Sequence, residues 1–350
     1  MELLQLLRQA VERGASDVLL IAGLPVAYKI NGVILREGER LGPADTAGLL
    51  EGLYRLAGER DMALLLQTGD DDFSFALPGL SRFRVNALKQ RGSLGAVVRV
   101  VSFTLPDRTA LGIPDNVMAF ASCPRGLVLF TGPAGSGKTT TLACIVDQVN
   151  STRNAHVITI EDPIEHLHQH KKSVVTQREL STDTRSYDAA LREAPDIILL
   201  GEMRDAETIR AAVTAAETGH LVISTLHTIG AANTIDRIVD SFPPEQQGQI
   251  RTQIALVLEG VVSQTLIPAV DGTLVPAFEV MTANNAVRNL IRESKAHQLD
   301  NVIAQSAAQG MITLDQSILK LAQAGRIAPA EALRYCMNPE WLQKRLSAQV

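Results

Sequence analysis

The stretch LVLFTGPAGSGKTTTLACIV, Leu127 to Val146, decides the fold of this 350-residue chain. An apolar run opens the stretch, a glycine-rich loop follows it, and a helical pattern comes last. Residues 132–139 match G-x-x-x-x-G-K-[ST], the pattern of a phosphate-binding loop. We therefore predict a strand, a loop and a helix in that order, with the loop wrapped around the phosphates of a nucleotide.

Each residue type in this loop has a physical reason to contact a phosphate. Glycines let backbone N–H groups turn inward around an anion, and the helix N-terminus adds the positive end of its dipole. Lys138 is expected to reach the β- and γ-phosphates, and Thr139 to offer its hydroxyl to Mg²⁺. A glycine-rich turn with an exposed lysine is the alternative, which the strand–loop–helix setting disfavours. The candidate nucleotide-binding residues are Gly132, Pro133, Ala134, Gly135, Ser136, Gly137, Lys138, Thr139 and Thr140.

Acidic residues follow neighbouring strands of the predicted sheet. IILLGE places Glu202 just beyond a buried strand, where a metal-associated acid belongs, and Gly201 stands where an aspartate is usual. ITIEDPIEH supplies Glu161, Asp162 and Glu165 after another strand, and any one of them can activate water as a general base. Acids after strands are also common as solvated turn residues. Two such clusters in the sheet that carries the phosphate loop favour a hydrolytic site.

Histidines follow a further predicted strand. TGHLVISTLHT places His220 and His227 at the ends of an apolar run. A lone histidine is often a packed or capping residue, but His227 lies where it can contact the γ-phosphate and report its loss. Zinc is not favoured, because the two histidines are seven positions apart and no cysteine is near them.

Basic residues form the last candidate group. RFRVNALKQRG places Arg82 and Arg84 on the same face of a predicted strand. A solvated strand face is one interpretation of this pattern. The other is that two domains close over the nucleotide, so that these arginines neutralise phosphate charge as arginine fingers do.

The chain is long enough for two domains. Residues 1–102 combine a few helices with short strands separated by turn signals, which predicts a small α+β domain; one helix-like stretch runs from Ala44 to Leu66. Residues 103–115, with two prolines, are the expected linker. Residues 116–280 alternate apolar runs with helical stretches, which predicts an α/β fold with a sheet buried on both faces. Residues 281–350 are expected to be helical.

Composition narrows the function classes. The 33 basic and 38 acidic side chains give a formal charge of −5, which argues against a protein that tracks nucleic acid. No apolar run approaches a membrane span, and the N-terminus lacks a secretory pattern. The three cysteines, Cys123, Cys144 and Cys336, are too scattered for a zinc ribbon or a disulfide framework. We expect a cytoplasmic protein.

The order of several motifs resembles secretion ATPases of bacterial type II and type IV pilus systems. The motifs are GASD, DFSF with RFRVNA, GPAGSGKTTTLA, TIEDPIEH, DIILLGEMRDAETI, AAETGHLVISTLHT and TIDRIVDSFP. The resemblance covers nearly the whole chain, and it is strongest to the twitching-motility PilT family of pilus-retraction motors. AVRNLIRES, Ala286–Ser294, is similar to the AIRNLIRE motif of that family, and the absent cysteine pairs agree with this assignment.

The resemblance implies a PAS-like N-terminal domain followed by a RecA-like P-loop ATPase domain. It makes residues 132–140 the Walker A loop, Glu202 the Walker B acid that holds Mg²⁺ through water, and residues 219–228 the His box. Residues 161–166 align with the Asp box, in which the catalytic glutamate falls on Glu165. The implied cofactors are ATP and Mg²⁺, and the implied catalytic residues are Glu165, Glu202, His227, Arg82 and Arg84.

The resemblance also implies a hexamer on the cytoplasmic side of an inner-membrane pilus machine. The expected partners are further copies of the chain and a membrane platform protein; a second retraction ATPase is left open, and no nucleic acid is expected. Three alternatives remain at this point. They are a pilus-extension or type II secretion ATPase, a DNA-translocating RecA-like ring, and a nucleotide-binding accessory subunit without turnover.

The chain departs from the family pattern at three places. Leu19 replaces a histidine, and Ser224 stands where a glycine is common. The segment YDAALREAPD, Tyr187–Asp196, is about four residues shorter than in the family, close to one helical turn of 3.6 residues. A loss of one turn keeps the inward face but moves the start of the next strand by about 6 Å, which puts the geometry of Glu202 and the strength of hydrolysis in question.

Overall fold

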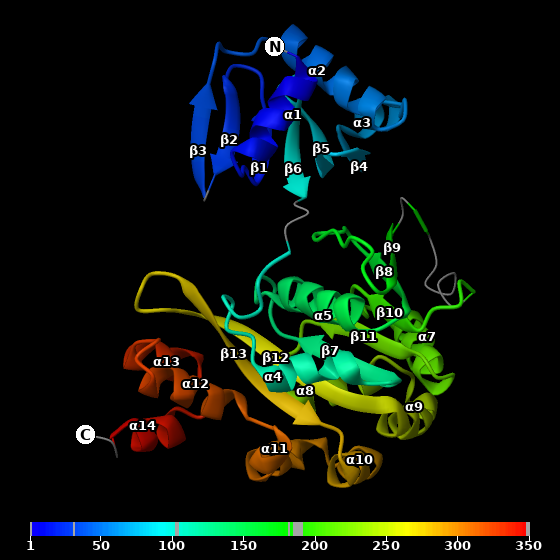
Figure 1. Cartoon of the computed structure of the whole chain (residues 1–350), viewed down its shortest axis with the longest axis vertical. Coiled ribbons are helices and arrows are strands. Elements are labelled where there is room, and N and C mark those ends of the chain that lie inside the picture. Colours follow the sequence, from blue (N-terminus) through cyan, green and yellow to red (C-terminus); the bar gives the residue numbers. More distant parts are fainter. Residues whose placement is uncertain (1, 31, 102–104, 181–182, 185–191, 348–350) are drawn as a thin grey trace. The chain divides into compact units, whose positions relative to one another are not determined.

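The structure is a computed structural model that describes residues 2–30, 32–101, 105–180, 183–184 and 192–347. The chain divides into two compact units, residues 1–104 with 165–167, and residues 105–164 with 168–350. Each unit has its own sheet and is described by itself (Figure 1).

The N-terminal unit is a six-stranded antiparallel sheet in the order β3-β2-β1-β6-β5-β4. Its strands are β1 (Asp17–Leu20), β2 (Val26–Ile30), β3 (Val33–Glu37), β4 (Asp70–Leu77), β5 (Ser81–Gln90) and β6 (Ser93–Val101). Its helices are α1 (Leu3–Glu12), α2 (Pro43–Leu56) and α3 (Ala63–Thr68). Phe83 and Val85 on β5 pack into one core with the helices, so Arg82 and Arg84 face the other side of the sheet. Their predicted common face is confirmed.

The prediction of one helix-like stretch from Ala44 to Leu66 is wrong. Two helices form instead, because the backbone at Gly58 and Glu59 has φ values of 79° and 57°, in the left-handed region that ends a helix. The break brings Arg60 to Asp71, which is buried. The Arg60 guanidinium donates two hydrogen bonds of 3.0 and 2.9 Å to that carboxylate. The pairing satisfies a charge that would otherwise be buried alone.

The C-terminal unit is built on a seven-stranded sheet in the order β13-β12-β7-β11-β10-β8-β9. Its strands are β7 (Gly126–Thr131), β8 (His156–Glu161), β9 (Val174–Glu179), β10 (Ile197–Leu200), β11 (Leu221–Leu226), β12 (Leu258–Pro268) and β13 (Leu274–Thr282). Neighbouring strands are parallel except for the antiparallel pair β12–β13. The predicted α/β fold class is confirmed, and so are the four apolar strands β7, β8, β10 and β11.

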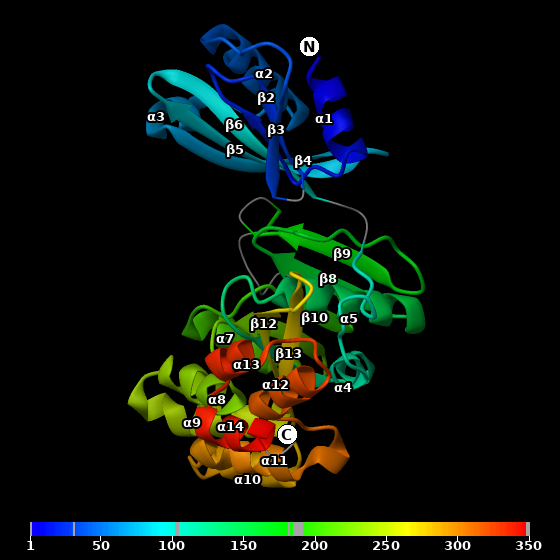
Figure 2. The same cartoon turned by 90° about the vertical axis from the view of Figure 1, so that its left-hand side faces the viewer.

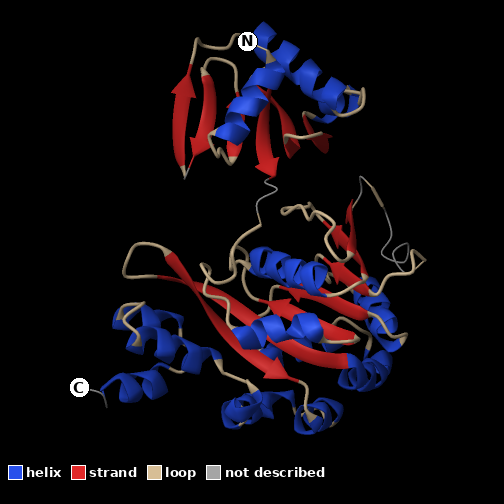
Figure 3. Ribbon diagram, in the orientation of Figure 1, coloured by secondary structure: helices blue, strands red, loops and turns tan. Residues whose placement is uncertain are grey.

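Helices cover both faces of this sheet (Figure 3). Alternate residues of β7 supply both cores: Leu127 and Leu129 pack on one face, and Val128 and Phe130 on the other. One face is covered by α7 (Ala206–Glu217), α8 (Ala231–Asp240), α9 (Pro244–Val257), α10 (Asn285–Arg292) and α11 (Leu299–Gln305). The other is covered by α4 (Asp115–Met118), the 3₁₀ turn η1 (Ala119–Ser122) and α5 (Lys138–Thr152).

The end of the chain is helical, and its last helices form a small core of their own. Short 3₁₀ turns, η2 (Ala296–Gln298) and η3 (Ala307–Gln309), flank α11. The helices α12 (Leu314–Gln323), α13 (Pro329–Tyr335) and α14 (Pro339–Ser347) follow. They pack beside the β12–β13 hairpin (Figure 2). Ile267 and Val275 of the hairpin share this core with Ile318. Among the described residues, no helix combines the length and the apolarity needed to cross a bilayer.

Candidate functional site

The glycine loop joins β7 to α5, in the predicted order. Gly132 and Gly137 have φ values of 140° and 84°, which favour glycine. A β-carbon at Gly132 would lie 2.1 Å from the backbone oxygen of Gln264, and one at Gly137 would lie 2.9 Å from the Gln264 Nε2 atom. The loop therefore lies against β12: backbone leaves no room for a side chain at Gly132, and at Gly137 the positive φ is what favours glycine.

Lys138 begins α5 and folds back over the loop. Its ammonium group donates hydrogen bonds to the carbonyl oxygens of Gly132 at 2.7 Å and Pro133 at 3.0 Å. The side chain is buried, and burial lowers the pKa of Lys138 from its usual value while the Glu202 carboxylate opposes that shift. Its partners are neutral carbonyls, so an anionic ligand in the loop would be a stronger partner for this cation.

Two buried hydroxyl groups, one at the end of β7 and one in the loop, have no hydrogen-bond partner in the part of the chain that the structure describes. Ser136 is 3% exposed and Thr131 is fully buried, and neither hydroxyl has a hydrogen-bond partner among the described residues. Buried polar groups are rarely left unsatisfied, so these two suit a loop that completes its hydrogen bonds with a phosphate. Thr139, half-buried in the first turn of α5, and Glu202 are oxygen donors of the kind that Mg²⁺ takes. The residues present fit a nucleotide and its magnesium.

Glu202 follows β10 and forms the centre of a polar network. One carboxylate oxygen, Oε1, lies 3.0 Å from His227 Nε2, and the other, Oε2, accepts a hydrogen bond of 2.8 Å from Arg204 Nε. The Arg204 guanidinium also lies 3.5 Å from a carboxylate oxygen of Asp162. The ends of β8, β10 and β11 thus meet through one arginine and one glutamate. Because Arg204 and His227 are more than half exposed, the network orients Glu202 more than it stabilises the fold.

Gly201 explains how these strand ends come so close. A β-carbon at Gly201 would lie 3.2 Å from the carbonyl oxygen of Ile160 and 3.3 Å from Glu161 Cα. The neighbouring strand β11 also holds Gly201 in place, because Thr225 Oγ1 donates a 2.5 Å hydrogen bond to the Gly201 carbonyl. Ser224 is accommodated as well, since its hydroxyl donates to the carbonyl of Leu200 at 2.9 Å.

The three acids at the end of β8 and in the turn after it have different surroundings. Glu161 accepts hydrogen bonds from Thr159 Oγ1 at 2.7 Å and from Gln177 Nε2 at 3.2 Å, so it is held within the sheet. Asp162 pairs with Arg204. Glu165 is exposed, and residues 165–167 group with the N-terminal unit.

Arg82 and Arg84 belong to the N-terminal unit. The Arg82 guanidinium donates a 2.7 Å hydrogen bond to Ser74 Oγ, and Arg84 lies 3.9 Å from a carboxylate oxygen of Asp72. Within that unit both side chains are positioned by β4. Half of the shortened segment Tyr187–Asp196, residues 187–191, lies outside the described residues; after the segment, β10 pairs in register with β8 from Ile197 onward.

Two site residues were not singled out from the sequence. Arg204 lies in a motif quoted above but received no role, although its charge close to Glu202 was the available signal. Gln264 had a weaker signal, a long polar side chain within the apolar run of β12. No group of three or more metal-ligating His, Cys, Asp or Glu side chains occurs in the part of the chain that the structure describes.

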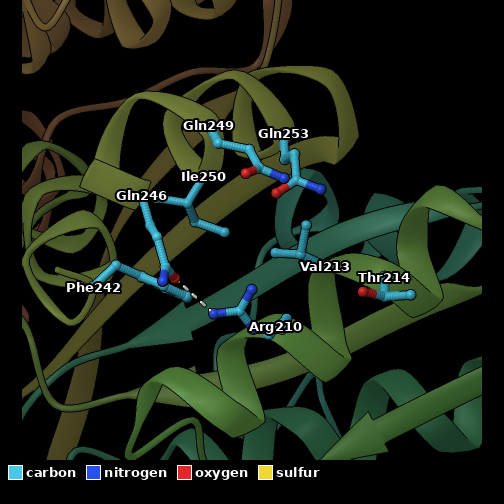
Figure 4. Close-up of a pocket in the computed structure, with 8 residues that line it drawn as sticks. All are labelled: Arg210, Val213, Thr214, Phe242, Gln246, Gln249, Ile250 and Gln253. Atoms are coloured by element: carbon cyan, nitrogen blue, oxygen red, sulfur yellow. Dashed lines mark hydrogen bonds between the residues drawn. The ribbon is translucent and has the colours of Figure 1, made fainter. Parts of the chain in front are cut away.

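A pocket also opens between α7 and α9 (Figure 4). There Arg210 donates a 2.8 Å hydrogen bond to Gln246 Oε1 and stacks over the ring of Phe242. The lining offers no carboxylate, so it does not compete with the phosphate loop as a hydrolytic site. It consists of Arg210, Val213, Thr214, Phe242, Gln246, Gln249, Ile250 and Gln253.

Comparison with known proteins agrees with this geometry. Residues 2–326 match the family described as type II/IV secretion system protein. The chain is 44% identical to the type IV pilus retraction ATPase PilT of Pseudomonas aeruginosa, over 97% of this chain and 99% of that protein. It is 50% identical to a twitching motility protein of Neisseria gonorrhoeae, over 77% of this chain and 73% of that protein.

A solved structure shows the same similarity in three dimensions. The pilus retraction motor PilT with bound ADP superposes with a TM-score of 0.89 at 44% identity, covering 98% of this chain and 99% of the other. A P-loop ATPase fold with an N-terminal domain is therefore shared along the whole length. The chain belongs to the type II/IV secretion system protein family and is a PilT-type ATPase.

Proposed function

We propose that this chain is a motor that hydrolyses ATP to retract type IV pili and so drives twitching motility. One observation carries the proposal: the phosphate loop with Lys138 and the network around Glu202 occur in a chain that is similar to PilT over 97% of its length. The loop supplies binding, and the strand-end acids supply the chemistry that hydrolysis needs.

The roles of the residues follow from their positions. When nucleotide binds, Lys138 would exchange its two carbonyl partners for phosphate oxygens. The new hydrogen bonds would join two charged groups and so be stronger than the ones they replace. Glu165 would accept the proton of the attacking water. His227, held against Glu202, would sense the terminal phosphate. Thr139 and, through water, Glu202 would hold Mg²⁺, whose charge offsets that of the phosphates when it is bound.

Arg82 and Arg84 are proposed to act on the developing phosphate charge from the N-terminal domain. Each has a described neighbour on β4, Ser74 for Arg82 and Asp72 for Arg84. Arg84 and Asp72 form a weak ion pair, because their charged atoms are 3.9 Å apart and the Arg84 side chain is 34% exposed. Arg84 would therefore lose little binding energy on leaving Asp72 for a phosphate.

The assembly proposed is a homohexamer in the cytoplasm, docked on an inner-membrane platform protein of the pilus machine, with a second retraction ATPase as a further partner. The similarity to PilT supports this over a pilus-extension or type II secretion ATPase, as do AVRNLIRES and the missing cysteine pairs. The acidic balance of the chain disfavours a DNA-translocating ring.

A deletion experiment tests the proposed function. We expect that removing the gene from its host leaves abundant surface pili and abolishes twitching, and that the wild-type gene restores it while Lys138→Ala does not. The matched control is Lys344→Ala, an exchange of the same kind on the exposed side of α14. A host that loses its surface pili would indicate an extension motor, and unchanged twitching would contradict the proposal.

A further inference from the structure

Gln264 lies on β12, directly behind the phosphate loop. It is 3% exposed, and its Oε1 atom accepts a 2.8 Å hydrogen bond from Thr141 Oγ1, which is also buried. Thr141 is in the first turn of α5, so this bond ties the start of the helix to a strand 123 positions further along the chain. Both members are shielded from water, where a side-chain hydrogen bond is hard to replace.

The same residue forms the wall against which the loop closes. β12 runs parallel to β7 with Ser263 opposite Thr131, so the next residue, Gln264, lies level with Gly132. Its backbone oxygen would meet a β-carbon at Gly132, and its Nε2 atom would meet one at Gly137. Gln264 therefore touches the first and the last glycine of the loop and its helix.

Ser263, the residue before Gln264, points to the opposite face of the sheet. Ser263 Oγ accepts a 3.0 Å hydrogen bond from the backbone N–H of Gly230, in the loop that follows His227. Successive residues of a strand point to opposite faces, so Ser263 and Gln264 each hold a different loop. The phosphate loop and the histidine loop are thus anchored on one strand.

We propose that Gln264 is a positioning residue that keeps the phosphate loop in its nucleotide-binding shape through Thr141. Gln264 contacts the loop from the side of β12. We therefore expect it to affect the affinity for nucleotide and not the cleavage of the phosphate bond. A loop already held in shape loses less freedom when its ligand binds, and this lowers the dissociation constant. The inference rests on the proposed binding of nucleotide in this loop, and it adds a residue that contributes to the affinity for that nucleotide.

Paired variants of the full-length chain test this inference, with ADP as the probe. Gln264→Met keeps the length of the side chain but removes its polar atoms, and Thr141→Val removes the hydroxyl but keeps the shape. We expect each to raise the dissociation constant for ADP about fivefold to tenfold, and the double variant to do no worse than either single one. The KM for ATP should rise in step, while kcat should change less than about twofold.

Two further variants separate positioning from general damage. Thr141→Ser keeps the donor and should bind ADP like the wild type. Thr152→Val removes a hydroxyl of the same helix that bonds to Gln148 at its exposed end, so it should also leave binding unchanged. Normal ADP affinity in folded Gln264→Met, or single effects that multiply in the double variant, would overturn the inference. A wild-type chain that binds no ADP would instead refute nucleotide binding by the loop.

Discussion

At the scale of single residues, the proposed mechanism gives Glu202 and Glu165 different roles, a metal-associated acid for Glu202 and a general base for Glu165. Glu202 has a partner on each carboxylate oxygen, His227 on one and Arg204 on the other. Glu165 is exposed and follows a buried isoleucine, Ile164. A general base has to be free to approach water, whereas a metal-associated acid has to keep its orientation.

Glu165→Gln tests that division of roles. Glutamine keeps the shape and polarity of the side chain but cannot accept a proton, so we expect ADP and ATP to bind with unchanged affinity while turnover falls at least about a hundredfold. Phosphate release and equilibrium nucleotide binding measure the two effects separately. Glu245→Gln, an equivalent exchange at an exposed site on α9, is the control. Near-normal phosphate release by Glu165→Gln would exclude Glu165 as the base.

The position of Lys138 could be predicted from the glycine-loop pattern, and those of Glu202 and His227 because each comes within two residues after a strand, and parallel strands bring their carboxyl ends to one edge. The positions of Gln264 and Arg204 could not be predicted in this way. Gln264 meets a partner 123 positions away, and Arg204 meets Asp162, 42 positions away. Such pairs depend on the order of strands in the sheet, which local patterns do not contain.

At the scale of elements, polar side chains on β12 and β13 fix the loops around the site. Glu279 on β13 is 6% exposed, and its Oε1 atom accepts a 2.8 Å hydrogen bond from the N–H of Ala231, the first residue of α8. With Ser263, it anchors the loop between His227 and α8. The strands β12 and β13 were not predicted individually, because these buried polar residues interrupt their apolar pattern.

This buried glutamate predicts how stability depends on pH. Burial raises the pKa of Glu279 to about 7, the carboxylates of Asp300 and Asp315 add to the shift, and the N–H groups of Ala231 and Leu314 oppose it. An acid with a raised pKa holds its proton longer in the folded state. The stability that it contributes is therefore complete below its usual pKa of 4.5 and is lost as the pH rises through about 7.

Glu279→Gln should remove that loss, because glutamine resembles the protonated acid and keeps the oxygen that accepts from Ala231. We expect the variant to exceed the wild type in unfolding free energy at pH 8 by up to about 3 kcal/mol, and by much less at pH 5. Urea denaturation across this range measures the difference. Glu207→Gln, at an exposed position on α7, should follow the wild type. Parallel pH curves for Glu279→Gln and the wild type would contradict the assignment.

At the scale of the whole molecule, the sequence predicts the kind of machine better than its assembly. Motifs spread from the N-terminal unit to α10 match one family, and the similarity to PilT extends over 97% of the chain. The assembly is harder to predict from the sequence than the family, because contacts between copies leave no periodic pattern and no fixed motif in one chain. The proposed ring therefore needs a test that changes the proportion of active and inactive subunits.

Mixing active and inactive subunits provides that test. If six subunits act in turn and one inactive member stalls the ring, an equal mixture leaves only about one ring in sixty without a Glu165→Gln subunit, so activity should fall far below half. The expected result is a steeply curved decline of phosphate release with the fraction of variant, measured after subunits have exchanged at fixed total protein. Dilution with Glu245→Gln subunits should leave activity unchanged. A straight line would show that subunits turn over independently, because each wild-type copy would then contribute its own share whatever its neighbours carry.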